Sequence, residues 1–271
     1  TLEGCRWLKE QGYQVGINLM QIADRSLAEI EALAGLASQY PLDALYFADS
    51  MGSMDPQQTS EIIGALQVGW AGELGIHTHH NMGRALANCM QAIADGVTWI
   101  DSTVTGMGRG AGNVQTEYLA VELATLRPDR PNNITPLMAL IRQYFGPMQQ
   151  EHGWGPNTYY YLAGKYGIHP TYIQSMLRDS RFNDEDVLAA IDHLKSSDSK
   201  KFNLNTLEAS RHFYVGTPLG TWNPASILKD REVLILGSGP GVARHRTALE
   251  KYIIRHKPFV IALNTQSHVA P

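Results

Sequence analysis

Two histidines separated by one residue are the first feature of this sequence that could do chemistry. His77 and His79 lie in the stretch 74–79, where apolar or small residues alternate with them. Such alternation is typical of a β-strand, in which residues two apart point to the same side. Two imidazoles side by side at a strand end suit a divalent metal ion. The structural alternative is a pair of histidines hydrogen-bonded to neighbouring carbonyl groups.

Three other polar residues that could act at such a site follow neighbouring strands. Asp49 ends one expected strand, and Arg109 and Asn113 lie in the glycine-rich loop 106–113 that follows another. The glycines would let the backbone come close to a substrate, although a tight strand-to-helix turn would also use them. The C-terminal ends of parallel strands form the site in α/β folds. We therefore expect Asp49, Asn113 and the histidine pair to open onto one mouth, while His80 points away.

The elements that would position these residues repeat four times as a strand, a loop and a helix. The expected strands cover residues 14–21, 44–49, 74–79 and 98–104. The expected helices that follow them cover residues 27–39, 56–68, 84–95 and 115–126. Four such units in succession, at intervals of roughly 25–30 residues, are typical of a parallel sheet with helices, which is the α/β class.

A polar, proline-rich break follows these four units, and the pattern then becomes helical. Further helices are expected at residues 136–145, 158–166, 171–178, 184–195 and 206–213. We expect Trp154 and the three tyrosines at 159–161 to pack against the sheet layer rather than to do chemistry. The domains that this organisation predicts are 1–127, a partial barrel, 128–229, a helical region, and 230–271, a glycine-rich βαβ domain.

The last of these domains opens with a strand that enters a glycine-rich turn, at residues 231–241. A helix at about 244–256 and a second strand at 258–263 complete the beginning of a Rossmann-like βαβ arrangement. Such a turn can place a phosphate at a helix N-terminus. It reads GxGxG rather than GxGxxG, and no acidic residue ends the second strand. A purely structural glycine turn is an equal alternative.

Composition excludes several classes of function. The net charge of −4 gives no electrostatic footprint for nucleic acid, and no apolar run approaches the ~18 residues of a membrane span. The two cysteines, Cys5 and Cys89, fit a reducing cytoplasm and leave no basis for a disulfide framework or a cysteine-based zinc site. The chain starts without an initiator methionine, in what reads as a helix, so we expect a fragment of a longer cytoplasmic protein.

Four motifs fall in order over residues 1–127: GINLMQIADRS, YFADSMGSM, GIHTHHNMGRALAN and DSTVTGMGRGAGN. Taken together, they resemble the metal-dependent pyruvate aldolases that cleave 4-hydroxy-2-oxovalerate. Those aldolases belong to a superfamily shared with hydroxymethylglutaryl-CoA lyase and isopropylmalate synthase. The double histidine followed by an asparagine, His79-His80-Asn81, resembles the aldolase branch in particular.

The resemblance implies a TIM (β/α)8 barrel of which this chain holds the C-terminal half, strands five to eight. It implies that His77 and His79 are metal ligands, with Mn²⁺ or Mg²⁺ as the metal, and that Asp49, Arg109 and Asn113 are catalytic. A carboxylate ligand, an arginine and a histidine base would lie in the other half of the barrel. These aldolases also use a tyrosine beyond the barrel, for which one of the three tyrosines named above is a candidate without an assigned role.

The expected reaction is the retro-aldol cleavage of a 4-hydroxy-2-keto acid to pyruvate and an aldehyde, through an enolate that the metal stabilises. Two alternatives stay open: an acyl-CoA-dependent synthase or lyase of the same superfamily, and a non-catalytic barrel that serves as a scaffold for the C-terminal domain. The expected partners are the 2-keto acid and either a second copy of the chain or an associated aldehyde-processing enzyme. We expect neither nucleic acid nor membrane as a partner, and we expect this fragment alone to be inactive.

Overall fold

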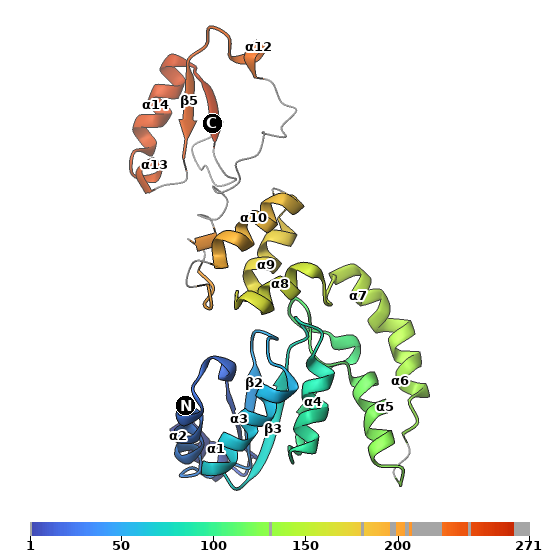
Figure 1. The fold of residues 1–271 in the computed structure, drawn as a ribbon. Coiled ribbons are helices and arrows are strands. Elements are labelled where there is room, and N and C mark those ends of the chain that lie inside the picture. Colours follow the sequence, from blue (N-terminus) through green and yellow to red (C-terminus); the bar gives the residue numbers. More distant parts are fainter. Residues whose placement is uncertain are drawn as a thin grey trace. The chain divides into compact units, whose positions relative to one another are not determined.

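The computed structural model describes residues 2–129, 132–179, 182–195, 199–203, 206–207, 224–237 and 240–262. The chain divides into two compact units, Thr1–Val215 and Gly216–Pro271 (Figure 1). Within the described residues, none of the helices combines the length and the apolar character needed to cross a membrane.

A four-stranded parallel sheet organises the larger unit. Its strands are β1 (Gly16–Leu19), β2 (Ala44–Asp49), β3 (Glu73–Thr78) and β4 (Trp99–Asp101). They pair in chain order, β1-β2-β3-β4, and every pairing is parallel. The prediction of four adjacent parallel strands is therefore confirmed. β1 and β4 are shorter than the expected strands 14–21 and 98–104.

One face of this sheet is covered by helices. Helix α1 (Leu2–Glu10) precedes β1. The helices of the four units are α2 (Leu27–Ala37), α3 (Pro56–Gly69), α4 (Ala85–Ala94) and α5 (Thr116–Leu126). Short 3₁₀ turns lie at Ile22–Asp24 and Val104–Gly106. Ser26 and Glu29 form the expected capping box at the start of α2. Leu45, Phe47 and Ile76 point toward the helices and are fully buried. This face supplies the core of the unit.

The other face of the sheet is more exposed and carries small, polar and aromatic residues. Because paired residues of parallel strands point to the same side, the strand registers give the members of this face: Gly16, Asn18, Ala44, Tyr46, Ala48, Glu73, Gly75, His77, Trp99 and Asp101. The ring of Tyr46 lies over Gly75, where an added Cβ would come within 2.5 Å of it. Asn18, Trp99 and Asp101 are exposed. We call this surface the open face of the large sheet.

A helical segment follows α5 in the same unit. It consists of α6 (Thr135–Leu140), a π-helical turn (Ile141–Phe145), α7 (Gly146–His152), α8 (Thr158–Tyr166), α9 (Pro170–Arg178) and α10 (Asp184–Lys195). Helices α8 to α10 enclose a core of their own. The expected helix 206–213 lies outside the described residues except for its first two positions.

This helical segment contacts the loops at the C-terminal ends of the strands. In α8, a Cβ added to Gly164 would lie 3.3 Å from Cβ of Asn81, in the loop after β3. Further along, Lys200 pairs with Asp24, in the loop after β1. Helices distant in sequence are thereby held at the edge of the sheet where the expected site lies.

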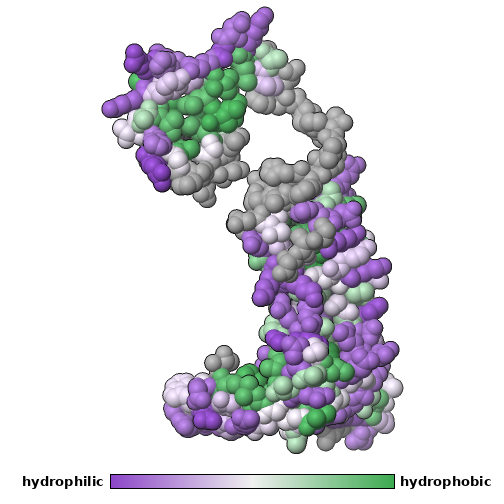
Figure 2. Space-filling model, turned by 60° about the vertical axis from the view of Figure 1, so that its left-hand side comes forward, coloured by the Kyte–Doolittle hydropathy of each residue, from purple (hydrophilic) through white to green (hydrophobic). Residues whose placement is uncertain are grey.

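The smaller unit contains a second sheet of two strands. β5 (Val233–Leu236) and β6 (Phe259–Ala262) pair in parallel, as predicted, and α12 (Ala225–Leu228), α13 (Pro240–Arg244) and α14 (Arg246–His256) accompany them. Leu236 packs with Ile253 of α14, whereas Val233 and Ile235 are 36% and 60% exposed. Figure 2 shows a hydrophobic area exposed on this unit.

Two expectations about the smaller unit concern its helix and its turn. The helix expected at 244–256 is divided into α13 and α14, because His245 leaves the helical conformation between them. The centre of the glycine-rich turn, Ser238 and Gly239, lies outside the described residues. The predicted domain boundaries after residues 127 and 229 remain predictions.

Candidate functional site

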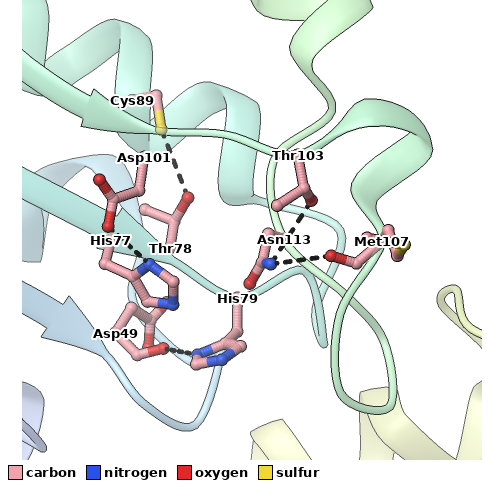
Figure 3. A network of polar contacts seen from close by, with 9 residues as sticks. All are labelled: Asp49, His77, Thr78, His79, Cys89, Asp101, Thr103, Met107 and Asn113. Carbon is pink, nitrogen blue, oxygen red and sulfur yellow. Dashed lines mark hydrogen bonds and ion pairs between the residues drawn. The ribbon is translucent and has the colours of Figure 1, made fainter.

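The two histidines of the expected pair lie together at the C-terminal end of β3 (Figure 3). His77 belongs to the strand, and His79 follows it in an isolated antiparallel bridge with Asn113. Their ring centroids are 4.9 Å apart, and the ring planes are at 82°. The expectation that the two imidazoles share one side of the sheet is confirmed, whereas their role as metal ligands stays a prediction.

Each of these imidazoles is held through Nδ1. His77 Nδ1 lies 3.1 Å from Oδ2 of Asp101, and His79 Nδ1 lies 2.8 Å from the backbone carbonyl oxygen of Asp49 (Figure 3). Both partners are acceptors, so each Nδ1 carries a proton and donates it. The lone pair of each ring is then at Nε2. Histidines that bind metals are typically oriented in this way, by a carboxylate or carbonyl behind the ring.

Burial keeps His79 neutral. It lowers the pKa of His79 to about 4, although the hydrogen bond to Asp49 opposes the effect. The positive charges of Arg109 and of His77 and His169, when these are protonated, lower it further. A neutral imidazole offers a lone pair, which a metal ion requires.

The carboxylate of Asp49 does not open onto the mouth beside the histidines, which corrects our expectation for this residue. Asp49 pairs with Thr78 in the sheet, so its side chain points toward the helices. It is 1% exposed, and its two carboxylate oxygens accept backbone N–H bonds from Ser53 (3.0 Å) and Met54 (3.2 Å). Burial raises the pKa of Asp49 to about 6. Asp49 contacts the histidine pair through its backbone carbonyl instead.

Asp101 is the carboxylate that the structure places beside the pair, and our sequence analysis missed it. It pairs with His77 across β3 and β4 and therefore shares its side of the sheet. The alternation of side chains in Trp99–Asp101 places Asp101 on the same side as Trp99, and the pairing with β3 then places it beside His77. Using that signal requires the register between two strands, which the sequence does not supply.

Asn113 lies beside His79 at the same mouth, as expected, and is 9% exposed. Its Nδ2 donates to the carbonyl oxygen of Met107 (3.2 Å), which leaves Oδ1 without a donor among the described residues (Figure 3). The loop around it is closely packed. A Cβ on Gly112, which has φ of +78°, would lie 2.0 Å from the carbonyl oxygen of Gly106. The glycines of this loop are therefore required by its backbone path.

Arg109 lies at the tip of this loop and is exposed. Burial lowers the pKa of its guanidinium, and Tyr160 opposes that effect. Its positive charge acts on both His79 and His169. No carboxylate forms an ion pair with Arg109 among the residues that the structure describes. Arg109 therefore presents an uncompensated positive charge near the histidine pair.

The helical segment adds Tyr160, one of the three tyrosines without an assigned role, and His169, which we did not consider. Tyr160 lies against the loop, because a Cβ on Gly110 would be 2.9 Å from its ring. His169 caps α9, with its Nδ1 accepting the backbone N–H of Thr171 (3.3 Å). The sequence His169-Pro170 indicates the start of a helix. It contains no pattern that would indicate that His169 lies near the histidine pair.

His80 has a different environment from its two neighbours. Its backbone N–H donates to the carbonyl oxygen of Gly112 (2.8 Å). Its Nδ1 is buried and has no hydrogen-bond partner within the described part of the chain. Burial lowers its pKa. The structure pairs His77 with His79, and His80 is not part of that ring contact.

The residues present fit a divalent metal ion in part. Two imidazole nitrogens, Nε2 of His77 and of His79, and one amide oxygen, Oδ1 of Asn113, come from neighbouring segments. Among the described residues, no group of three or more histidine, cysteine, aspartate or glutamate side chains is arranged to hold a metal. Imidazole nitrogen and amide oxygen are both ligand types that divalent metal ions accept.

The parallel sheet with helices on one face defines an α/β fold, in which a polar cluster lies at the C-terminal ends of the strands. A family model described as HMGL-like matches residues 3–143, and the chain belongs to the HMGL-like family. The α/β fold class is thereby confirmed.

Several known proteins are similar to this chain. It is 32% identical over 169 residues to 4-hydroxy-2-oxovalerate aldolase 4 of Rhodococcus opacus, covering 61% of this chain and 49% of that protein. It is 30% identical over 165 residues to 4-hydroxy-2-oxovalerate aldolase of Carboxydothermus hydrogenoformans, covering 60% and 49%. The crystal structure of the N-terminal domain of a proposed aldolase from Bacteroides vulgatus aligns with a TM-score of 0.57 at 27% identity, covering 66% of this chain and 60% of that one. The chain spans about half the length of the curated relatives it matches.

Proposed function

We propose that this chain belongs to a divalent-metal-dependent aldolase that cleaves a 4-hydroxy-2-keto acid to pyruvate and an aldehyde. The observation that carries the proposal is the orientation of His77 and His79, each held through Nδ1 with Nε2 free. Both relatives named above are 4-hydroxy-2-oxovalerate aldolases, which supports the substrate class.

The donor set suits the chelation of a 2-keto acid. When bound to His77 and His79, Mn²⁺ or Mg²⁺ supplies a Lewis acid for the keto group. Asn113 Oδ1 is available as a further oxygen donor or to orient a bound water. The guanidinium of Arg109 is exposed and available to the substrate carboxylate, to which it could donate charge-assisted hydrogen bonds.

The reaction needs two proton transfers: the C4 hydroxyl oxygen loses a proton, and carbon C3 gains one. The C4 hydroxyl loses its proton and the bond between C3 and C4 breaks, which leaves the electron pair on the enolate of pyruvate. That enolate then takes a proton at C3. His169 offers a neutral N–H donor near this mouth, because its Nδ1 accepts from Thr171 and its Nε2 therefore carries the proton.

The test is release of pyruvate from 4-hydroxy-2-oxovalerate by the full-length protein with Mn²⁺ and without coenzyme A. We expect turnover that requires the metal, is abolished in His77→Ala and His79→Ala, and persists in His80→Ala. Activity only with an acyl-CoA would support the synthase or lyase alternative. Absence of turnover in a folded protein that binds Mn²⁺ would support a scaffold and contradict the proposal.

A further inference from the structure

A cavity adjoins the glycine-rich loop on the side of the helical segment. Its volume is about 270 Å³, and Gly108 and Gly110 of the loop line it together with Tyr160 of α8. A water molecule occupies roughly 30 Å³ of liquid, so this volume corresponds to about nine waters. That is enough room for a carboxylate or a phosphate on a short carbon stem.

The described residues that line this cavity include hydrogen-bond donors and a positive charge but no acidic side chain. Arg178, at the end of α9, contributes a guanidinium, and Gln174 and His152 contribute further polar groups. Arg178 has no carboxylate partner in the described ranges. A lining that carries a positive charge and no carboxylate favours an anion over a cation.

Tyr160 connects this cavity with the candidate site. Its side chain is 4% exposed, and its ring lies against Gly110, next to Arg109. Burial raises the pKa of Tyr160, whereas Arg178 and then Arg109 oppose that rise. Two positive charges therefore act on one buried phenol, one from the site loop and one from α9. Neither has a carboxylate partner within the described part of the chain.

Arg109 and Arg178 are both exposed, and neither has a carboxylate partner within the described residues, so each guanidinium is available to an anion. Arg109 is accounted for by the substrate carboxylate under the proposed aldolase function, on which the present inference rests. Arg178, which lines the cavity, is then available to a second anion. We propose that the cavity beside Tyr160 binds a second anionic group of the substrate, so that the substrate class is a 4-hydroxy-2-keto acid whose far end carries a carboxylate or a phosphate.

Binding experiments on the full-length protein with Mn²⁺ separate this inference from the proposed function. Oxalate, a chelating mimic of the pyruvate enolate, probes the histidine pair, and inorganic phosphate probes the cavity. We expect Arg178→Gln to weaken phosphate binding at least tenfold and to leave oxalate binding unchanged, as measured by calorimetry. Arg178→Lys, which keeps the charge, should restore part of the affinity. Arg127→Gln, a matched change at an exposed arginine after α5, should alter neither.

Kinetics identify the far-end group. Three substrates of equal chain length, ending in a methyl group, a carboxylate or a phosphate, should differ in KM rather than in kcat, with at least a tenfold lower KM for one of the two anions. Arg178→Gln should remove that advantage and leave the methyl-ended substrate unaffected. Oxalate binding together with equal KM values for all three substrates would overturn the inference and leave the aldolase intact. Failure to bind oxalate would overturn the proposed function itself.

Discussion

Both sheets of this protein have a helix-covered face and an open face, but the two open faces differ in chemistry. The open face of the large sheet carries His77 and Asp101 beside small residues such as Ala48. The open face of the small sheet, on the side of Val233 and Ile235, is entirely apolar. Parallel sheets are usually covered on both faces. An apolar open face therefore needs another layer of protein, whereas a polar open face can serve a ligand.

The largest expected effect is on the free energy of unfolding, which should depend more on the covered face of the large sheet than on its open face. Phe47→Ala removes a fully buried ring from the core, and we expect it to lower the free energy of unfolding by about 4 kcal/mol. Tyr46→Ala, one residue away on the open face, should cost about 1 kcal/mol. Urea unfolding followed by tryptophan fluorescence measures both. Equal losses would show that the open face is covered as tightly as the other.

The next effect concerns the carboxylate of Asp49 on the covered face. Its pKa of about 6 in the folded protein lies above its ordinary value of 3.8, so the folded state holds the proton more tightly than the unfolded state. The resulting stabilisation is full below about pH 4 and is lost as the pH rises through about 6, a change of about 3 kcal/mol. Unfolding measured from pH 4 to 7 should show this slope in the wild type and not in Asp49→Asn. Identical slopes would contradict burial of this carboxyl group.

Metal binding tests whether the open face is a site. His79→Ala removes one of two nitrogen donors, and we expect Mn²⁺ affinity to fall about 100-fold or more. His80→Ala should change it by less than about threefold, because that ring is outside the pair. Electron paramagnetic resonance of free Mn²⁺ during titration gives both affinities. A larger loss in His80→Ala than in His79→Ala would reverse the assignment.

A smaller effect is expected from the carboxylate behind His77. Asp101→Asn keeps the size of the side chain but weakens the acceptor that orients the ring through Nδ1. Changes of this kind typically cost ~10-fold in metal affinity. Asp129→Asn, at an exposed carboxylate after α5, is the control. An unchanged Mn²⁺ affinity in Asp101→Asn would show that the ring is held by other contacts.

The smallest effect is expected on the apolar open face of the small sheet. Ile235→Lys replaces a 60% exposed side chain and should change the stability of the C-terminal unit by less than about 0.5 kcal/mol. Leu236→Ala, on the covered face, should cost about 3 kcal/mol. Hydrogen exchange of the β5 amides reports both. A large loss in Ile235→Lys would mean that another layer of protein packs on this face.

The sequence predicted the strand order and the histidine pair because both depend on local patterns. Alternation around His77 gives the strand and the direction of the side chains without any distant contact. The same alternation, applied to Leu45, Phe47 and Asp49, already places Asp49 on the apolar side, so our error there was avoidable. Asp101 required a register between strands, and Tyr160 required the packing of a helix that begins more than 40 residues after the loop it contacts. Neither kind of information is contained in a short motif.

The loop at 106–113 divides its positions into those that can vary and those that cannot. A side chain at Gly112 would overlap the backbone of Gly106, so every substitution there disturbs the peptide that carries Asn113. Arg109, at the tip, has no such restriction, because its side chain is exposed. Amino-acid substitutions compatible with this loop would therefore accumulate at its tip and on the helices that face it. New substrate preferences could then arise there by single substitutions, without a change in the histidine pair.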